Sequence, residues 1–85
     1  MNIQLRFFAS VREALELSQE SIVVPPEVKT VGDVRAFLRG RGGKWAETLA
    51  EGRSLRMAYN QEMTAATTPI SEGCEVAFFP PVTGG

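Results

Sequence analysis

A chain of 85 residues, 44% of them hydrophobic, is long enough for one folded domain. Its formal net charge of -1 gives it no general attraction to nucleic acid or to an anionic membrane. The sequence has no histidine and one cysteine, which excludes histidine-based triads, histidine metal sites, internal disulfides and Cys-x-x-Cys sites. No apolar run approaches the roughly 20 residues that cross a bilayer, and the N-terminus lacks the layout of a signal peptide, so a cytoplasmic location is expected.

The chain begins with a segment that alternates between polar and apolar residues over positions 2–8. This period of two is typical of a strand with one face buried. We expect Ile3, Leu5 and Phe7 to face the core, which leaves Phe8 on the opposite face of the sheet.

A short helix and a second strand are predicted next. Residues 11–17 are expected to be helical, with Ser10 as a plausible N-cap. Residues 20–24 are apolar and β-branched enough for a strand, and Pro25 and Pro26 should end it because proline cannot continue strand pairing.

The main helix is predicted to begin after Thr30. Asp33 lies three residues later, where its side chain can support the first turn. The glycines at 40, 42 and 43 are expected to end the helix. Four apolar residues at helical spacing form one apolar stripe: Val31, Val34, Phe37 and Leu38.

The second half of the chain predicts one more short helix and three strands. Residues 44–50 look helical, and residues 55–59 alternate as a strand that ends at a turn over residues 60–62. Residues 63–68 are expected to form a short edge strand. Residues 75–79 are apolar on both faces, which indicates a strand at the centre of the sheet.

This order of elements predicts an α+β fold, a mixed sheet of about five strands packed on one main helix. If the first and last strands pair at the centre, the architecture is a β-grasp, as in ubiquitin. The β-grasp domain then spans residues 1–79, and residues 80–85 form an extended C-terminal tail.

The tail reads Pro80-Pro81-Val82-Thr83-Gly84-Gly85. The two prolines cannot extend the strand and favour a polyproline II backbone, so six residues would reach roughly 20 Å from the body. The last two residues have no side chains, and a narrow channel could admit them with a carboxylate at the tip. For a bare Gly-Gly, the alternative is a frayed end or a scar of cleavage.

The block from Glu75 to Gly85 closely resembles the C-terminus of the small subunit of molybdopterin synthase. The segment Phe7-Phe8-Ala9-Ser10-Val11-Arg12-Glu13 is similar to the opening of that family, and Tyr59-Asn60-Gln61-Glu62 is similar to a turn before its short strand. The resemblance therefore covers both ends and the middle of the chain.

The resemblance implies a mechanism and a set of partners. An E1-like adenylating enzyme would use Mg-ATP to activate the carboxylate of Gly85, and a sulfur donor would convert it into a thiocarboxylate. The tail, with Gly84 and Gly85 at its tip, would then enter the large subunit of the synthase, in an expected heterotetramer of two small and two large subunits. Sulfur would pass to cyclic pyranopterin monophosphate to build the dithiolene of molybdopterin. The carrier binds no cofactor itself, and the catalytic residues would belong to the large subunit.

Partner docking is expected on apolar residues beside the tail. If the terminal strands pair, Phe8 and Phe79 share the outer sheet face, and Met63 joins them from just past the turn. The alternative is that one or more of the three belongs to the core. The family binds its partners through apolar contacts near the tail, so the resemblance extends this role to Pro80, Pro81, Val82 and Thr83.

Three other signals predict structure rather than chemistry. The run from Gly40 to Lys44 lacks the spacing of a phosphate-binding loop and indicates a helix end. Cys74 lies between acidic neighbours that disfavour a thiolate, which indicates a buried strand thiol rather than a persulfide carrier. The basic residues Arg35, Arg39, Arg41 and Lys44 are expected on a solvated helix face, with contact to an acidic partner as the alternative.

Three competing functions stay open at this point. A β-grasp sulfur carrier could serve thiamin thiazole or tRNA thiolation, and a ubiquitin-like modifier would join lysines through the same carboxylate. A non-covalent binding module would not use its terminus at all. An added residue after Gly85 distinguishes the binding module from the other two functions. It should abolish the activity of a carrier or a modifier and leave a binding module unaffected.

Overall fold

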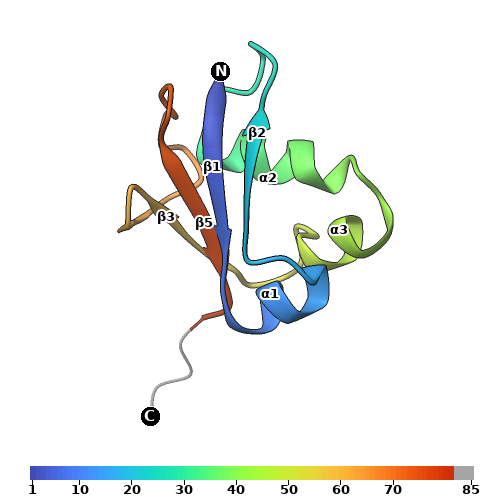
Figure 1. Cartoon of the computed structure of the whole chain (residues 1–85). Coiled ribbons are helices and arrows are strands. Elements are labelled where there is room, and N and C mark those ends of the chain that lie inside the picture. The colour runs from blue at the N-terminus through green and yellow to red at the C-terminus, as the bar shows by residue number, and fades with distance from the viewer. Residues whose placement is uncertain (82–85) are drawn as a thin grey trace.

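The computed structural model describes residues 1–81; the predicted tail residues Val82, Thr83, Gly84 and Gly85 lie outside the described part. The described chain forms five strands and three helices (Figure 1). They are β1 (Asn2–Phe7), α1 (Ala9–Leu15), β2 (Gln19–Val23), α2 (Val31–Arg39), α3 (Gly43–Thr48), β3 (Arg56–Tyr59), β4 (Glu62–Thr64) and β5 (Glu75–Phe79).

The strands form one mixed sheet in the order β2-β1-β5-β3-β4. The first and last strands are neighbours at its centre and run parallel, with Leu5 opposite Val76 and Phe7 opposite Phe78, while the other pairs are antiparallel. The predicted α+β fold, a β-grasp with β5 at the centre, is confirmed. This pairing brings the two ends of the chain together, which is why β5 ends beside the start of α1 (Figure 1).

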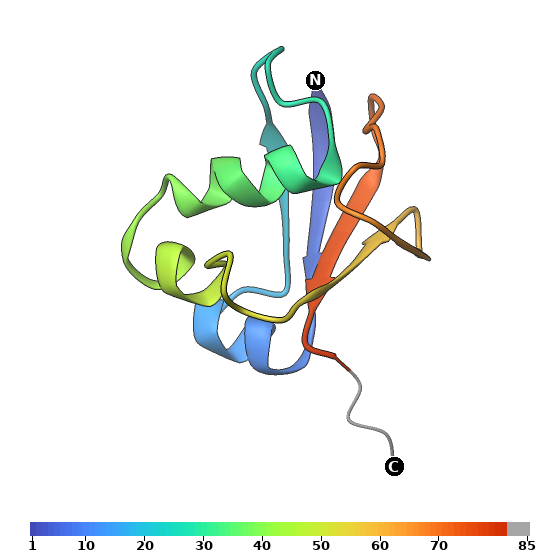
Figure 2. The ribbon, with the colours of Figure 1, turned by 180° about the vertical axis from the view of Figure 1, so that it is seen from behind.

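The core lies between one face of the sheet and the helices (Figure 2). The predicted inward residues of β1, Ile3, Leu5 and Phe7, are at most 1% exposed, and Val76 and Phe78 of β5 are fully buried beside them. Each such side chain contributes roughly 1.5–3 kcal/mol to folding through the burial of apolar surface. Burial of the inner-face side chains thus stabilises the sheet, and the outer face does not pack against the helices.

The start of α2 follows the prediction. The Asp33 amide donates to the Thr30 hydroxyl at 3.1 Å, and the Thr30 amide donates back to the Asp33 carboxylate at 3.2 Å, which completes a capping box. Of the predicted apolar stripe, Val31, Val34 and Leu38 are buried, while Phe37 stays 38% exposed. Phe37 lies at the border of the stripe, facing β2 across a shallow hollow.

The first helix differs from its prediction. It begins at Ala9, two residues earlier than expected, and Phe8 rather than Ser10 is the capping position, with no side-chain cap bond. The helix starts as soon as β1 ends because this brings Val11 and Leu15 onto the core, where both are 2% exposed. Glu16 ends it in the left-handed region, at φ 56°.

The edge strand also differs from its prediction. It covers Glu62–Thr64 rather than residues 63–68, because Asn60 and Gln61 form the turn by themselves with φ of 48° and 69°. The residues after β4 instead hold the first turn of α2. The amide of Val31 donates to the carbonyl of Thr68 at 2.9 Å.

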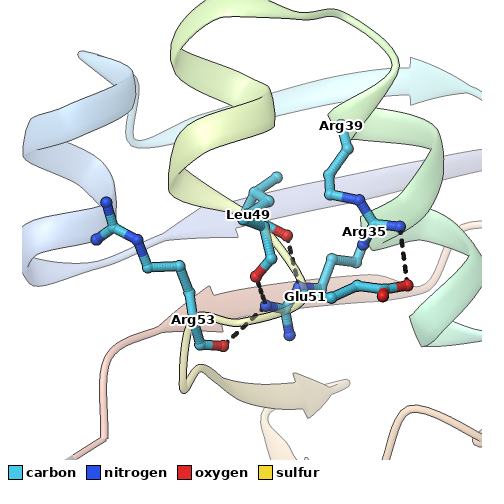
Figure 3. Close-up of polar contacts among 6 residues, drawn as sticks. Arg35, Arg39, Leu49, Glu51 and Arg53 are labelled. Carbon is cyan, nitrogen blue, oxygen red and sulfur yellow. Dashed lines mark hydrogen bonds and ion pairs between the residues drawn. The ribbon is translucent and has the colours of Figure 1, made fainter.

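The basic run on α2 and α3 is held by the protein itself, not by solvent. Arg35 donates to the carbonyls of Leu49, Ala50 and Arg53, the segment that links α3 to β3 (Figure 3). Arg39 pairs with Glu51 at 3.3 Å, which Figure 3 also shows, so the prediction of a merely solvated face was wrong. Arg41 pairs with Glu20 at 2.8 Å and Lys44 with Glu16 at 3.3 Å. These residues fasten the helices to the sheet and to the β3 connection.

Residues 1–81 contain no helix with the length and hydrophobicity needed to span a bilayer. They also bring together no group of three or more Cys, Asp or Glu side chains that could hold a metal ion.

Candidate functional site

The outer face of the sheet carries an apolar hollow of about 370 Å³ at its centre. We call it the outer hollow. It forms because strand alternation sends every second side chain of three adjacent strands to the face away from the helices. Its lining residues are Phe8, Ala58, Gln61, Met63, Glu75, Ala77 and Phe79.

Two alanines form the floor of the outer hollow. Ala58 of β3 lies directly opposite Ala77 of β5 in the strand register, and Met63 of β4 is the next partner of Ala58. Since methyl groups reach only a short way above the sheet, the larger side chains around them stand as walls. The result is a recess rather than a flat apolar surface.

The aromatic wall comes from the two ends of the chain. The rings of Phe8 and Phe79 meet edge to face, with centroids 6.2 Å apart and planes at 81°. On the inner face, Phe7 and Phe78 stack with centroids 6.3 Å apart and anchor the same two strands in the core. A buried aromatic pair therefore fixes the position of an exposed one.

The predicted docking residues Phe8, Met63 and Phe79 are brought together here, as expected. Phe8 is 39% exposed and Met63 63% exposed, while Phe79 is half-buried against its neighbours. Exposed apolar side chains that gather in one recess mark a surface that another molecule covers.

The root of the tail lies next to this wall. Pro80 and Pro81 follow β5 directly, and both are half-buried. Pro80 lines a smaller hollow of about 310 Å³ with Ser10 and Val11 of α1 and with Leu55. β5 thus ends beside the start of α1 (Figure 1).

Charged residues stand at the rim of the outer hollow. Arg6 lies on the outer face of β1 with its guanidinium carbon 5.3 Å from the centre of the Phe8 ring, and its nearest carboxylate, Glu75, is 4.0 Å away. Arg56 is exposed and is the strand partner of Phe79. Strand alternation already predicts Arg6 on the same face as Phe8, although sequence reasoning assigned it no role. Sequence reasoning missed Arg56 and the alanine floor, because only the register of distant strands places them beside Phe79.

Cys74 lies apart from this site. Its side chain is 3% exposed and belongs to the core cluster, which agrees with the predicted buried thiol. The run from Gly40 to Lys44 ends α2 and starts α3, as predicted, with Gly42 and Gly43 at positive φ.

Comparison with known proteins gives three consistent likenesses. A family model described as the ThiS family matches residues 5–85. The molybdopterin synthase sulfur carrier subunit of Escherichia coli (strain K12) is 39% identical over 83 residues, which are 98% of this chain and 99% of that protein. A chain in the solved protein-protein complex of subunits 1 and 2 of molybdopterin-converting factor from Helicobacter pylori 26695 is 25% identical, with a TM-score of 0.65 and full coverage of both chains.

The fold also occurs in a protein with a different name. The crystal structure of small archaeal modifier protein 1 from Haloferax volcanii aligns with a TM-score of 0.74 at 23% identity, over 95% of this chain and 98% of that one. At this level of identity the likeness concerns the fold alone.

Proposed function

The chain belongs to the ThiS family, and from this premise we propose that it is the sulfur-carrier subunit of a molybdopterin synthase. The observation that carries the proposal is the match along nearly the whole length to a protein of that name, 39% identical. The outer hollow at the root of the tail supports it, since a carrier has to be held by its partners while its end reaches into their sites.

The chemistry of the proposal is carried by the terminal carboxylate of Gly85. An oxygen of this carboxylate attacks the α-phosphorus of Mg-ATP on an E1-like adenylating enzyme, and pyrophosphate leaves. The acyl adenylate then accepts a hydrosulfide equivalent from a sulfur donor, and AMP leaves as a thiocarboxylate forms. Each step replaces one leaving group on the acyl carbon or on phosphorus, so the carrier itself needs no acid–base residue.

Delivery is the second half of the proposal. Gly84 and Gly85 enter the large subunit of the synthase, and the thiocarboxylate sulfur attacks a carbon of cyclic pyranopterin monophosphate, where the new carbon–sulfur bond replaces a carbon–oxygen bond and the oxygen substituent leaves. Hydrolysis of the resulting acyl link returns the carboxylate of Gly85 for another round. Phe8, Met63 and Phe79 hold the large subunit, and residues 80–83 bridge the distance, in a heterotetramer of two small and two large subunits.

One experiment tests the chemistry directly. The full chain is incubated with an adenylating enzyme, Mg-ATP and a sulfur source, and its intact mass is measured. We expect a gain that matches the exchange of one oxygen for one sulfur, located at Gly85 by fragmentation. A modification found on Cys74 instead, or isopeptide conjugates to lysines of other proteins, would contradict the proposal.

A further inference from the structure

The strongest unexplained feature of the outer face is Arg6, at the rim of the outer hollow. It is opposite Ala77 of the floor in the strand register, and its guanidinium group lies against the ring of Phe8. Its side chain is 39% exposed. A molecule that covers Phe8 therefore comes within reach of this cation.

Arg6 is poorly paired among the residues that the structure describes. Its only ion pair, with Glu75, is 4.0 Å long, and its Nε is buried with no hydrogen-bond partner in residues 1–81. By contrast, Arg41 makes a two-point contact with Glu20 at 2.8 and 3.0 Å. A guanidinium group has five N–H donors, so Arg6 keeps donors that this chain does not use.

The surroundings of Arg6 select a particular kind of ligand. The outer hollow beside it is apolar, and exposed Arg56 stands on its other side, next to Phe79. Glu75 lies toward the β3–β4 turn, where its carbonyl accepts from the amide of Asn60, and it sets the acidic end of this face. A complementary protein surface thus has an apolar side chain for the hollow and a carboxylate for the arginines, because opposite potentials meet across interfaces.

We propose that the large subunit places a carboxylate side chain against Arg6, beside an apolar side chain that enters the outer hollow. The identity of the partner rests on the function proposed above; the chemistry of its contact rests on the geometry of Arg6. The partner's carboxylate gives Arg6 a closer ion pair than its 4.0 Å contact with Glu75. The apolar side chain excludes water from this ion pair and thereby strengthens it.

The test measures the Kd of the full chain for the large subunit by calorimetry. Arg6→Gln keeps the size and polarity of the side chain but removes its charge, and we expect about tenfold weaker binding, the contribution of one charged hydrogen bond. Arg6→Lys retains the charge and should retain part of the affinity. Lys29→Gln removes the same charge from an exposed site before α2 and should bind like the unsubstituted chain.

Salt dependence provides a second readout. Raising the ionic strength from about 0.05 M to about 0.3 M should weaken the unsubstituted complex more than the Arg6→Gln complex, because screening acts on the charge that the variant lacks. Equal salt dependence of the two, or equal Kd values for Arg6→Gln and Lys29→Gln, would overturn the inference. Tight binding of single-stranded RNA that is lost in Arg6→Gln would also overturn it.

A failure of the Arg6 contact can be distinguished from a failure of the function proposed above. Thiocarboxylate formation at Gly85 is read by mass, without the large subunit. A chain that is loaded normally and binds without any contribution from Arg6 would keep the function and remove the carboxylate contact.

Discussion

Phe8 and Phe79 meet edge to face on the outer sheet although they belong to opposite ends of the chain. Their contact exists because β1 and β5 run parallel at the centre of the sheet, so both strands finish at the same end. The tail continues from one of these phenylalanines and α1 from the other. The proposed docking surface and the start of the tail therefore lie at the ends of the same two strands.

The exposed aromatic wall should dominate partner binding. We expect Phe8→Ala to weaken binding of the large subunit by about 2 kcal/mol or more, roughly thirtyfold in Kd, as for an aromatic hot spot. Phe37→Ala is the matched control, since Phe37 is exposed to almost the same extent (38% against 39%) but lies on α2. Equal losses for the two variants, measured by calorimetry, would disprove the role of the outer hollow.

The terminal carboxylate should be essential for loading and unimportant for folding. One alanine added after Gly85 is expected to abolish thiocarboxylate formation, because the reactive group is then no longer attached to glycine at the correct reach. Thermal unfolding should be unchanged, since the core lies entirely within residues 3–78. Intact mass and circular dichroism check the two parts. Sulfur gain in the extended chain would refute the mechanism.

The buried thiol should take no part in sulfur transfer. Cys74→Ala is expected to load as fast as the unsubstituted chain, because Cys74 is 3% exposed and faces the core. The cavity that it leaves should lower the free energy of unfolding by about 1 kcal/mol. If alkylation of Cys74 in the folded protein blocked loading, the thiol would have a chemical role after all.

Arg35 should be the most important of the basic residues for stability. Arg35→Met removes three hydrogen bonds to the carbonyls of Leu49, Ala50 and Arg53, and we expect a loss of about 2 kcal/mol in the free energy of unfolding. The control Arg39→Met breaks an ion pair with the exposed Glu51 and should cost less than about 1 kcal/mol. Urea unfolding measures both, and the same loss in the two variants would contradict this ranking.

Acid should destabilise the protein through two carboxyl groups. The Lys29 amide, which donates to Asp33 at 3.0 Å, holds the pKa of Asp33 below its usual 3.8, and the Asn2 amide lowers the pKa of Glu72 below 4.5 in the same way. Since the unfolded chain then binds more protons than the folded chain, this stability is complete above the usual values and is lost as the pH falls through the lowered ones.

The double variant Asp33→Asn, Glu72→Gln tests this dependence. We expect it to be less stable than the unsubstituted chain at neutral pH, and the difference to shrink as the pH falls from about 5 to about 2. Glu13→Gln, on the exposed side of α1, is the control, because it removes one negative charge without changing the contacts of Asp33 or Glu72. If the difference in Tm between the double variant and the unsubstituted chain stayed constant across this pH range, ionisation of the two carboxyl groups would not contribute to stability.

Local patterns were sufficient to predict most of the fold. The alternation around Leu5, the capping pair Thr30 and Asp33, and the two-sided apolar run of β5 each predicted their element because one short-range physical requirement decides it. Ser10 misled the prediction of α1, since the burial of Val11 and Leu15 decided where the helix starts. Tertiary packing outweighed the preference of one capping residue.

The candidate site was predictable only in part. Phe8 and Phe79 could be assigned to one face from strand alternation, but the recess between them depends on Ala58 lying opposite Ala77, which is a matter of register between distant segments. Alternation alone puts Arg6 on the face of Phe8, but its pairing with Glu75 again depends on the position of β5. No sequence window contains both partners of such a pair, so the shape and charge of the site had to come from the structure.

The central parallel pairing of β1 with β5 also makes recognition depend on completed synthesis. The aromatic wall of the outer hollow forms only after β5 has paired with β1. A nascent or truncated chain without β5 therefore lacks this surface. If the chain has the function proposed above, its partners would find this surface only on a polypeptide whose synthesis has reached β5.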